Sequence, residues 1–364
     1  MKIYPIPMVP GPTLVPKQVL EAGMINYGSA DLEADFFTRY LETERYLQAL
    51  LGTANRVVVM TGEGMLALWS ALKSTLLPGD RVLAVSSGVF GTGIGEMAKS
   101  IGCEVKVVSH PYDSPANDFQ AMEDAIRSFK PKMITAVHCE TPSGVMNPLK
   151  ALGELKQRYE VPLLYVDAVA SVGGAHVEVD KNHIDLCLGG SQKVLSAPAN
   201  STFLSVSRRA WEVAEEVRYV GYDALLPFKE APEKRYFPYS PSWVNIEQLA
   251  CASSLILDAG LEKTIQSHED HALLVRESMQ EMGYKLFVVD EAYAAATVSA
   301  FYLPDGVSWE HFDHSLRSKG LVVGGSYGPM AGKIFRLGHM GSQSNRKMIN
   351  EALTVLREVR PSQV

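Results

Sequence analysis

Apolar and polar positions follow two rhythms along the first two-thirds of the chain. Short, nearly continuous apolar runs such as VVVM (57–60), VLAVS (82–86) and LLYVD (163–167) have the length and composition of buried strands. Between these runs, segments such as 118–129 and 150–159 carry apolar residues at helical spacing. Strands that alternate with helices predict right-handed crossovers, and therefore a mostly parallel, seven-stranded sheet covered by helices on both faces.

The same patterns place further elements. Residues 31–52 predict a helix that stops at Gly52, and 201–207 predict the last strand of the large sheet, as an antiparallel edge strand. Beyond residue 211 a helix (211–218) leads into an irregular stretch, 222–243, which is long enough to be functional or part of an interface. A bent helix over 245–282 and candidate strands at 284–289, 297–304, 320–327 and 333–340 predict a second unit. We therefore expect an N-terminal arm (1–15), a large domain (16–245) and a small α+β domain (246–364).

The composition narrows the possible functions. With 34 Lys and Arg against 41 Asp and Glu, the net charge is -7 and no block of like charge occurs, which disfavours a nucleic-acid or anionic-membrane partner. The four cysteines form no CxxC pair, so neither a zinc site nor a disulfide framework is indicated. No apolar run resembles a signal peptide or reaches the roughly 20 residues of a membrane helix. A cytoplasmic protein without a structural metal is the prediction.

Polar residues gather where the predicted parallel strands end. Five strand ends carry polar residues. These ends are Gly62-Glu63-Gly64, Ser86–Gly88 followed by Phe90, His138–Thr141, Asp167 with Ser171, and Ser191–Lys193. Ligands of doubly wound sheets bind outside the carboxyl ends of the strands. These five ends therefore predict one shared crevice.

Lys193 and Asp167 are charged residues that the sequence places next to apolar strands, where a charge is unusual. Asp167 ends an apolar strand, where a carboxylate is costly unless a positive group meets it; a structural or capping aspartate is the alternative. Lys193 lies in GGSQKVLSAPA, and a lysine held near the core loses proton affinity and becomes a nucleophilic amine. An ordinary surface lysine is its alternative.

A nucleophilic lysine with an aspartate partner is the arrangement that pyridoxal 5'-phosphate (PLP) requires. The lysine forms a Schiff base, and the acid keeps the pyridine nitrogen protonated so that the ring acts as an electron sink. The turn TGEGM opens a helix whose N-terminus can hold a phosphate. Phe90 could stack on the ring, although a core phenylalanine is the favoured interpretation of this residue taken alone. The residue pattern thus favours a PLP site.

The strand FRLGHMG (335–341) adds a candidate for substrate recognition. Arg336 interrupts an apolar strand and offers a bidentate fork for a carboxylate, with an exposed edge-strand arginine as the alternative. His339 has no partner at metal-ligand spacing, so we interpret it as a supporting residue.

Together, VDAVASVGG around Asp167, GSQKVLSAP around Lys193, ETPSGV (140–145) and FRLGHMG resemble the class V aminotransferases of PLP fold type I. Within that family the chain is similar to alanine-glyoxylate, serine-pyruvate and pyridoxamine-pyruvate enzymes. The resemblance implies ping-pong transfer of an amino group from alanine or serine to glyoxylate or pyruvate. It also implies a homodimer in which each subunit completes the other's site.

The resemblance assigns roles to individual residues. It implies Lys193 as the Schiff-base lysine, Asp167 as the partner of the pyridine nitrogen, Arg336 as the binder of the substrate carboxylate, and Gly11 as a glycine that approaches the substrate. The cofactor would further contact the following residues: Glu63, Gly64, Met65, Phe90, Thr141, Val169, Gln192, and, from the partner subunit, Tyr239 and Ser240 of the Tyr-Ser-Pro segment.

Some positions depart from the alanine-glyoxylate pattern. Ser-Gly-His is replaced by Glu63-Gly64-Met65, and a carboxylate beside a phosphate is electrostatically unfavourable. This glutamate and the TPSG that follows Glu140 are more similar to the pyridoxamine-pyruvate enzyme, in which the unphosphorylated vitamer is a substrate, whereas Tyr327 stands where that enzyme has a second arginine. A cysteine-desulfurase-like lyase, a non-catalytic binding protein and a dehydrogenase using the GEGMLA turn are the remaining alternatives.

Overall fold

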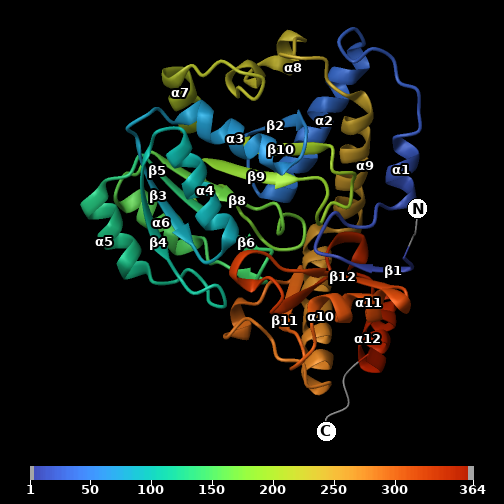
Figure 1. Ribbon diagram of the computed structural model, residues 1–364. Coiled ribbons are helices and arrows are strands. Elements are labelled where there is room, and N and C mark those ends of the chain that lie inside the picture. Colours follow the sequence, from blue (N-terminus) through green and yellow to red (C-terminus); the bar gives the residue numbers. More distant parts are fainter. Residues whose placement is uncertain (1–3, 360–364) are drawn as a thin grey trace.

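The computed structural model describes residues 4–359, which contain two main sheets in separate parts of the molecule and one short two-stranded sheet. Figure 1 shows the larger sheet in the blue-to-yellow-green part of the chain and the smaller one, apart from its blue first strand, in the orange-to-red part. The large sheet has the strand order β2 (Arg56–Thr61), β10 (Ser201–Val206), β9 (Leu186–Gly190), β8 (Leu163–Asp167), β5 (Met133–Val137), β3 (Arg81–Ser86) and β4 (Glu104–Ser109). The prediction of seven strands is confirmed.

All strands of the large sheet run in the same direction except β10, which is antiparallel to both neighbours, β2 and β9. The expected edge position of β10 is therefore wrong, although its expected direction is right. Every residue of β10 is buried, whereas all six residues of the edge strand β4 are half-buried or exposed. Burial on both faces explains why the central strands are nearly continuous apolar runs.

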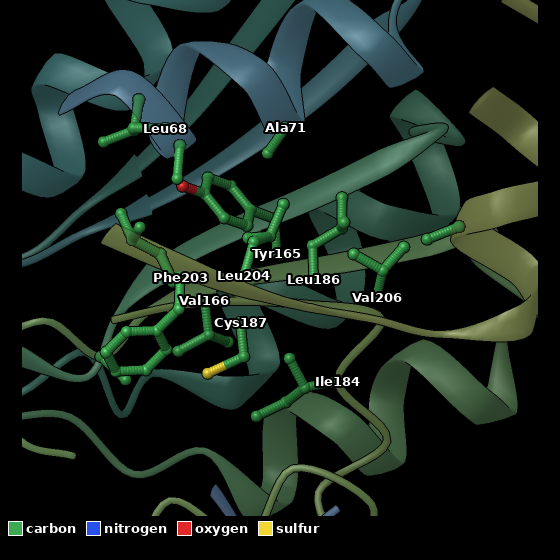
Figure 2. Packing of buried hydrophobic residues seen from close by; sticks show 14 of the residues in the cluster. Leu68, Ala71, Tyr165, Val166, Ile184, Leu186, Cys187, Phe203, Leu204 and Val206 are labelled. Carbon is green, nitrogen blue, oxygen red and sulfur yellow. The ribbon is translucent and has the colours of Figure 1, made fainter. Parts of the chain in front are cut away.

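Helices cover both faces of this sheet. They are α1 (Lys17–Ala22), α2 (Ala34–Leu51), α3 (Gly64–Thr75), α4 (Val89–Ser100), α5 (Phe119–Phe129), α6 (Lys150–Arg158), α7 (Arg208–Val217) and the short α8 (Ala231–Lys234). Figure 2 shows Leu68 and Ala71 of α3 above the strands that carry Tyr165 and Leu204, with Ile184 below them. Gly52, with a left-handed φ of 64°, ends α2 as the sequence predicts.

The predicted bent helix is two helices, α9 (Trp243–Ala259) and α10 (Leu261–Glu281), separated at Gly260. Helix α9 packs on the core of the large sheet and α10 on that of the small one, so the break lies where the chain passes between the two cores. The small unit is completed by β11 (Val298–Tyr302), α11 (Trp309–Ser318), β12 (Leu321–Gly325), β13 (Ile334–Gly338) and α12 (Arg346–Val359).

Two details of the small unit differ from the sequence prediction. Residues 284–289 form no regular strand and make only one bridge, between Leu286 and Phe301. Conversely, the expected arm contributes β1 (Ile6–Met8), which pairs in parallel with β12. The small sheet therefore has the order β1-β12-β13-β11 and contains the start of the chain (Figure 1). The domain boundaries remain a prediction.

Within residues 4–359, the helices are too short or too polar to cross a membrane.

Candidate active site

The carboxyl ends of the parallel strands surround one cavity of about 280 Å³. The short pair β6 (Cys139–Glu140) and β7 (Val145–Met146) lies beyond β5 and adds Cys139 and the adjacent Thr141 to the cavity. Nine of the residues predicted from sequence line it: Glu63, Gly64, Met65, Phe90, Thr141, Asp167, Val169, Gln192 and Lys193. The structure thus brings together side chains that are as far apart as 130 positions in the chain.

Lys193 lies in the turn after β9 and points into this cavity. Its Nζ donates a hydrogen bond of 2.6 Å to the carbonyl of Pro10, in the N-terminal segment. Burial and, to a smaller extent, the nearby positive charge of Arg336 lower the pKa of Lys193 from 10.5 to about 8. The amine is therefore partly neutral near neutral pH, which is the state that a nucleophile or proton acceptor needs.

Asp167 is the last residue of β8, and its Oδ1 accepts a hydrogen bond of 2.9 Å from the backbone N-H of Val169. Burial raises its pKa to about 6, while the Val169 hydrogen bond and the charge of Lys193 oppose the rise. Asp167 is consequently ionised at neutral pH. An ionised carboxylate at this depth can hold a protonated ring nitrogen.

The N-terminus of α3 opens onto the same cavity and carries Glu63 as its cap. Glu63 Oε2 accepts from the backbone N-H of Met65 at 3.0 Å, and Oε1 accepts from Gln192 Nε2 at 2.7 Å. Gln192 Oε1, in contrast, is buried without a hydrogen-bond partner among residues 4–359. A helix N-terminus attracts anions, and here a carboxylate of the chain itself occupies that position.

Glu140 is a residue to which the sequence assigned no role. It is completely buried, and its carboxylate accepts hydrogen bonds from the backbone N-H groups of Gly91 (2.7 Å) and Phe90 (3.2 Å) at the start of α4. Burial raises its pKa to about 7. The sequence had placed Glu140 in the polar strand end His138–Thr141. A second signal is Gly88, a cap position whose lack of a polar side chain leaves the first N-H groups of α4 in need of another acceptor.

Arg336 and Gly11 reach the site from outside the large sheet. Arg336, on β13, donates to the carbonyls of Gly325 (2.7 Å) and Thr141 (3.2 Å), and its Cζ lies 4.8 Å from the centre of the Tyr327 ring. Both of these acceptors are uncharged carbonyl groups, so the charge of the guanidinium remains available to a carboxylate. A Cβ added at Gly11 would lie 2.5 Å from Lys193 Cδ, so any larger residue would displace the lysine.

Tyr239 and Ser240 do not line the cavity of their own chain. The Tyr239 hydroxyl accepts from the backbone N-H of Thr61 at 3.4 Å, and Ser240 Oγ donates to Asp31 at 3.2 Å. His339 lies apart from the cavity as well, fully buried between Ser299 and the carbonyl of Ala296. Sequence reasoning also missed the apolar lining, which includes Pro12, Leu68, Ala170, Leu188 and Ala199, because apolar residues carry no chemical signal of their own.

A family model described as aminotransferase class V matches residues 8–337. An uncharacterized aminotransferase of Methanocaldococcus jannaschii is 35% identical to this chain, covering 94% of it and 89% of the relative. The alanine-glyoxylate aminotransferase of Oryctolagus cuniculus is 31% identical, covering 96% of this chain and 91% of the relative. The solved structure of a pyridoxamine-pyruvate aminotransferase from Mesorhizobium loti superposes with a TM-score of 0.93 at 29% identity, covering 98% of this chain and 92% of the other. The chain belongs to the class V aminotransferases, PLP-dependent enzymes of fold type I that transfer an amino group to a 2-oxo acid.

Proposed function

We propose that this aminotransferase moves an amino group from a small amino acid, alanine or serine, to glyoxylate or pyruvate, with PLP bound through Lys193. The observation that carries the proposal is the pairing of a largely buried, partly neutral lysine with an ionised aspartate in one cavity. A binding protein without catalytic activity would not need a lysine with a lowered pKa. A dehydrogenase would leave Lys193 without a role.

The residues present fit the ring of the cofactor better than its phosphate. Asp167 and Lys193 suit the ring nitrogen and the aldehyde, and Phe90 borders the same cavity. At the other end, the N-H groups at the start of α3 face Glu63, so a phosphate there requires this carboxylate to turn away or take up a proton. When bound, the cofactor supplies an electron sink for the carbanion formed at the substrate α carbon.

Three side chains of the protein then perform the transfer. Lys193 Nζ would accept the proton of the substrate α carbon and later donate it, and with a pKa of about 8 roughly a tenth of its amines are neutral at pH 7. Asp167 would hold the protonated ring nitrogen. Arg336 binds the α-carboxylate, and Gly11 and Pro12 close over Lys193, which favours substrates with short side chains.

Glu63 favours a second candidate function, pyridoxamine-pyruvate transamination with the unphosphorylated vitamer as substrate. In that reaction no phosphate has to be held at the N-terminus of α3, and the hydrogen bonds of Glu63 to Met65 and Gln192 could remain as they are. The resemblance to the Mesorhizobium enzyme supports this candidate.

One titration tests the lysine and separates the two candidates. Pyridoxal or PLP added to the protein produces a visible absorption band if Lys193 forms the bond, and the band is absent in Lys193→Ala. Tighter binding of PLP supports the first candidate, and tighter binding of pyridoxal, with turnover of pyridoxamine and pyruvate, supports the second. No band with either compound would overturn the assignment of Lys193.

We also propose a homodimer in which Tyr239 and Ser240 face the partner's cavity. Support comes from exposed apolar side chains in two segments that the Ser240–Asp31 hydrogen bond joins, among them Met24, Leu32, Val220 and Tyr236. Such side chains are typical of an interface. Sedimentation that finds a fully active monomer would overturn this proposal. Four unpaired cysteines support the further prediction of a reducing, cytoplasmic compartment.

A further inference from the structure

The N-terminal segment 9–14 lies directly against the lysine turn. The carbonyl of Pro10 accepts the hydrogen bond of Lys193 Nζ at 2.6 Å, and Gly11 packs against the lysine side chain. Thr13 adds two bonds, because its N-H donates to the carbonyl of Gln192 at 3.0 Å and its hydroxyl donates to the carbonyl of Lys193 at 2.8 Å. The position of this segment therefore decides how Lys193 is oriented and how well it is shielded from water.

Gln343 holds this segment from the opposite side, at both of its ends. Its Nε2 donates to the carbonyl of Val9 at 2.7 Å, and its Oε1 accepts from the N-H of Leu14 at 3.1 Å. The second N-H of the same amide donates to the carbonyl of Gly338 at 2.6 Å. Gln343 is completely buried, so both donors and the acceptor of one carboxamide are used inside the protein.

The third bond connects the segment to the strand that carries Arg336. Gly338 ends β13, two positions after Arg336, and a Cβ added there would lie 2.1 Å from the carbonyl oxygen of Val9. The backbone of Gly338 is therefore in direct contact with the backbone of Val9. Gln343 bridges that contact and ties the lysine-facing segment to the arginine-bearing strand.

We propose that Gln343 is a positioning residue for the amino-transfer reaction, acting on Lys193 through segment 9–14. Its carboxamide fixes the segment between the small sheet and the lysine turn, so that the carbonyl of Pro10 orients Nζ and the segment keeps water from the amine. The inference rests on the proposed role of Lys193 in the reaction. The hydrogen bonds by which Gln343 places segment 9–14 do not depend on that role.

The test replaces Gln343 with Met, which keeps a long side chain but removes all three hydrogen bonds. Hydrogen exchange of the peptide covering residues 9–14 is expected to accelerate about tenfold. In the cofactor-free, full-length chain, the pH midpoint for reductive methylation of Lys193 is expected to move up by about one unit, because water reaches the amine and burial is the main cause of its lowered pKa.

The matched control is Gln48→Leu, which removes another glutamine hydrogen bond, from Gln48 Nε2 to the carbonyl of Asn55; neither residue lines the cavity. It is expected to change neither readout. If Gln343→Met does not fold, Gln343→Glu keeps the size and the acceptor for Leu14 while losing both donors, and the same two shifts are expected.

Unchanged exchange in 9–14, or an unchanged Lys193 midpoint despite faster exchange, would overturn the inference. Failure of the proposed function has a different signature. In that case wild-type Lys193 forms no bond with pyridoxal or PLP, while the exchange measurement still reports on Gln343.

Discussion

Two helices, α3 and α4, begin at the same cavity, and a glutamate caps each of them in a different way. Glu63 immediately precedes α3, is exposed, and binds the N-H of Met65 two residues later. Glu140 comes from β6, about 50 positions after the start of α4, and is completely buried while it binds the N-H groups of Phe90 and Gly91. One cap is local and accessible, and the other is remote and enclosed.

This difference in exposure indicates that the Glu63 cap belongs to a ligand site, whereas the Glu140 cap belongs to the structural framework. A ligand anion can displace an exposed carboxylate at little cost, because water solvates the displaced group. A buried carboxylate that satisfies one buried and one partly buried N-H group has no such alternative, and its loss leaves those groups unpaired. We therefore expect Glu63 to influence what binds at α3, and Glu140 to stabilise α4 and the position of Phe90.

The largest expected effect is on stability. Glu140→Ala should lower the free energy of unfolding by about 3 kcal/mol, because one buried and one partly buried N-H group lose a charged acceptor. Glu63→Ala should lower it by about 1 kcal/mol or less, the usual cost of removing an exposed helix cap. Urea unfolding of the two variants measures the difference. Equal losses would show that the two caps are equivalent.

The next effect is a pH dependence that belongs to Glu140. Its pKa is raised from 4.5 to about 7 in the fold, so the folded state binds the proton more tightly than the unfolded state and stability falls as pH rises through this range. From about pH 5 to about pH 6.5 the wild type should lose about 2 kcal/mol more than Glu140→Gln. Asp167 titrates in both proteins and cancels in the difference. Parallel curves of stability against pH would contradict the raised pKa.

The smallest effect concerns the ligand at α3. Glu63→Ser removes the negative charge from the helix N-terminus and should raise the affinity for PLP relative to pyridoxal by about tenfold. Absorbance titrations with both compounds measure this ratio. Glu277→Ser, which removes an exposed glutamate from α10, serves as the control. A ratio that rises in both variants would trace the effect to net charge alone.

The sequence predicted those elements correctly whose signal is local. It failed for features that depend on contacts with segments distant in the chain. The apolar runs identified all seven strands of the large sheet, and Gly52 identified the end of α2. The position of β10 was misjudged because an edge strand and a central strand differ in their neighbours, which lie far away in the chain. Residues 284–289 have a strand-like composition, but only Leu286 finds a bridge partner.

The candidate site divides in the same way. Lys193, Asp167 and Arg336 could be identified from sequence, because a charged residue beside an apolar run is costly to bury unless it has a partner or a function. Glu140 and Gln343 could not be given roles, since a buried glutamate or glutamine has no distinguishing neighbours until the N-H and carbonyl groups it pairs with are known.

The sequence by itself determined the alternation of strands and helices and the residue types at the strand ends, because periodicity and strand length are local properties. Only the tertiary structure decided that the first residues of the chain form β1, that Glu140 caps α4, and that Gln343 holds segment 9–14 over Lys193. These contacts join segments that are 50 to more than 300 residues apart, and such pairs are selected by packing and by the need to satisfy buried polar groups.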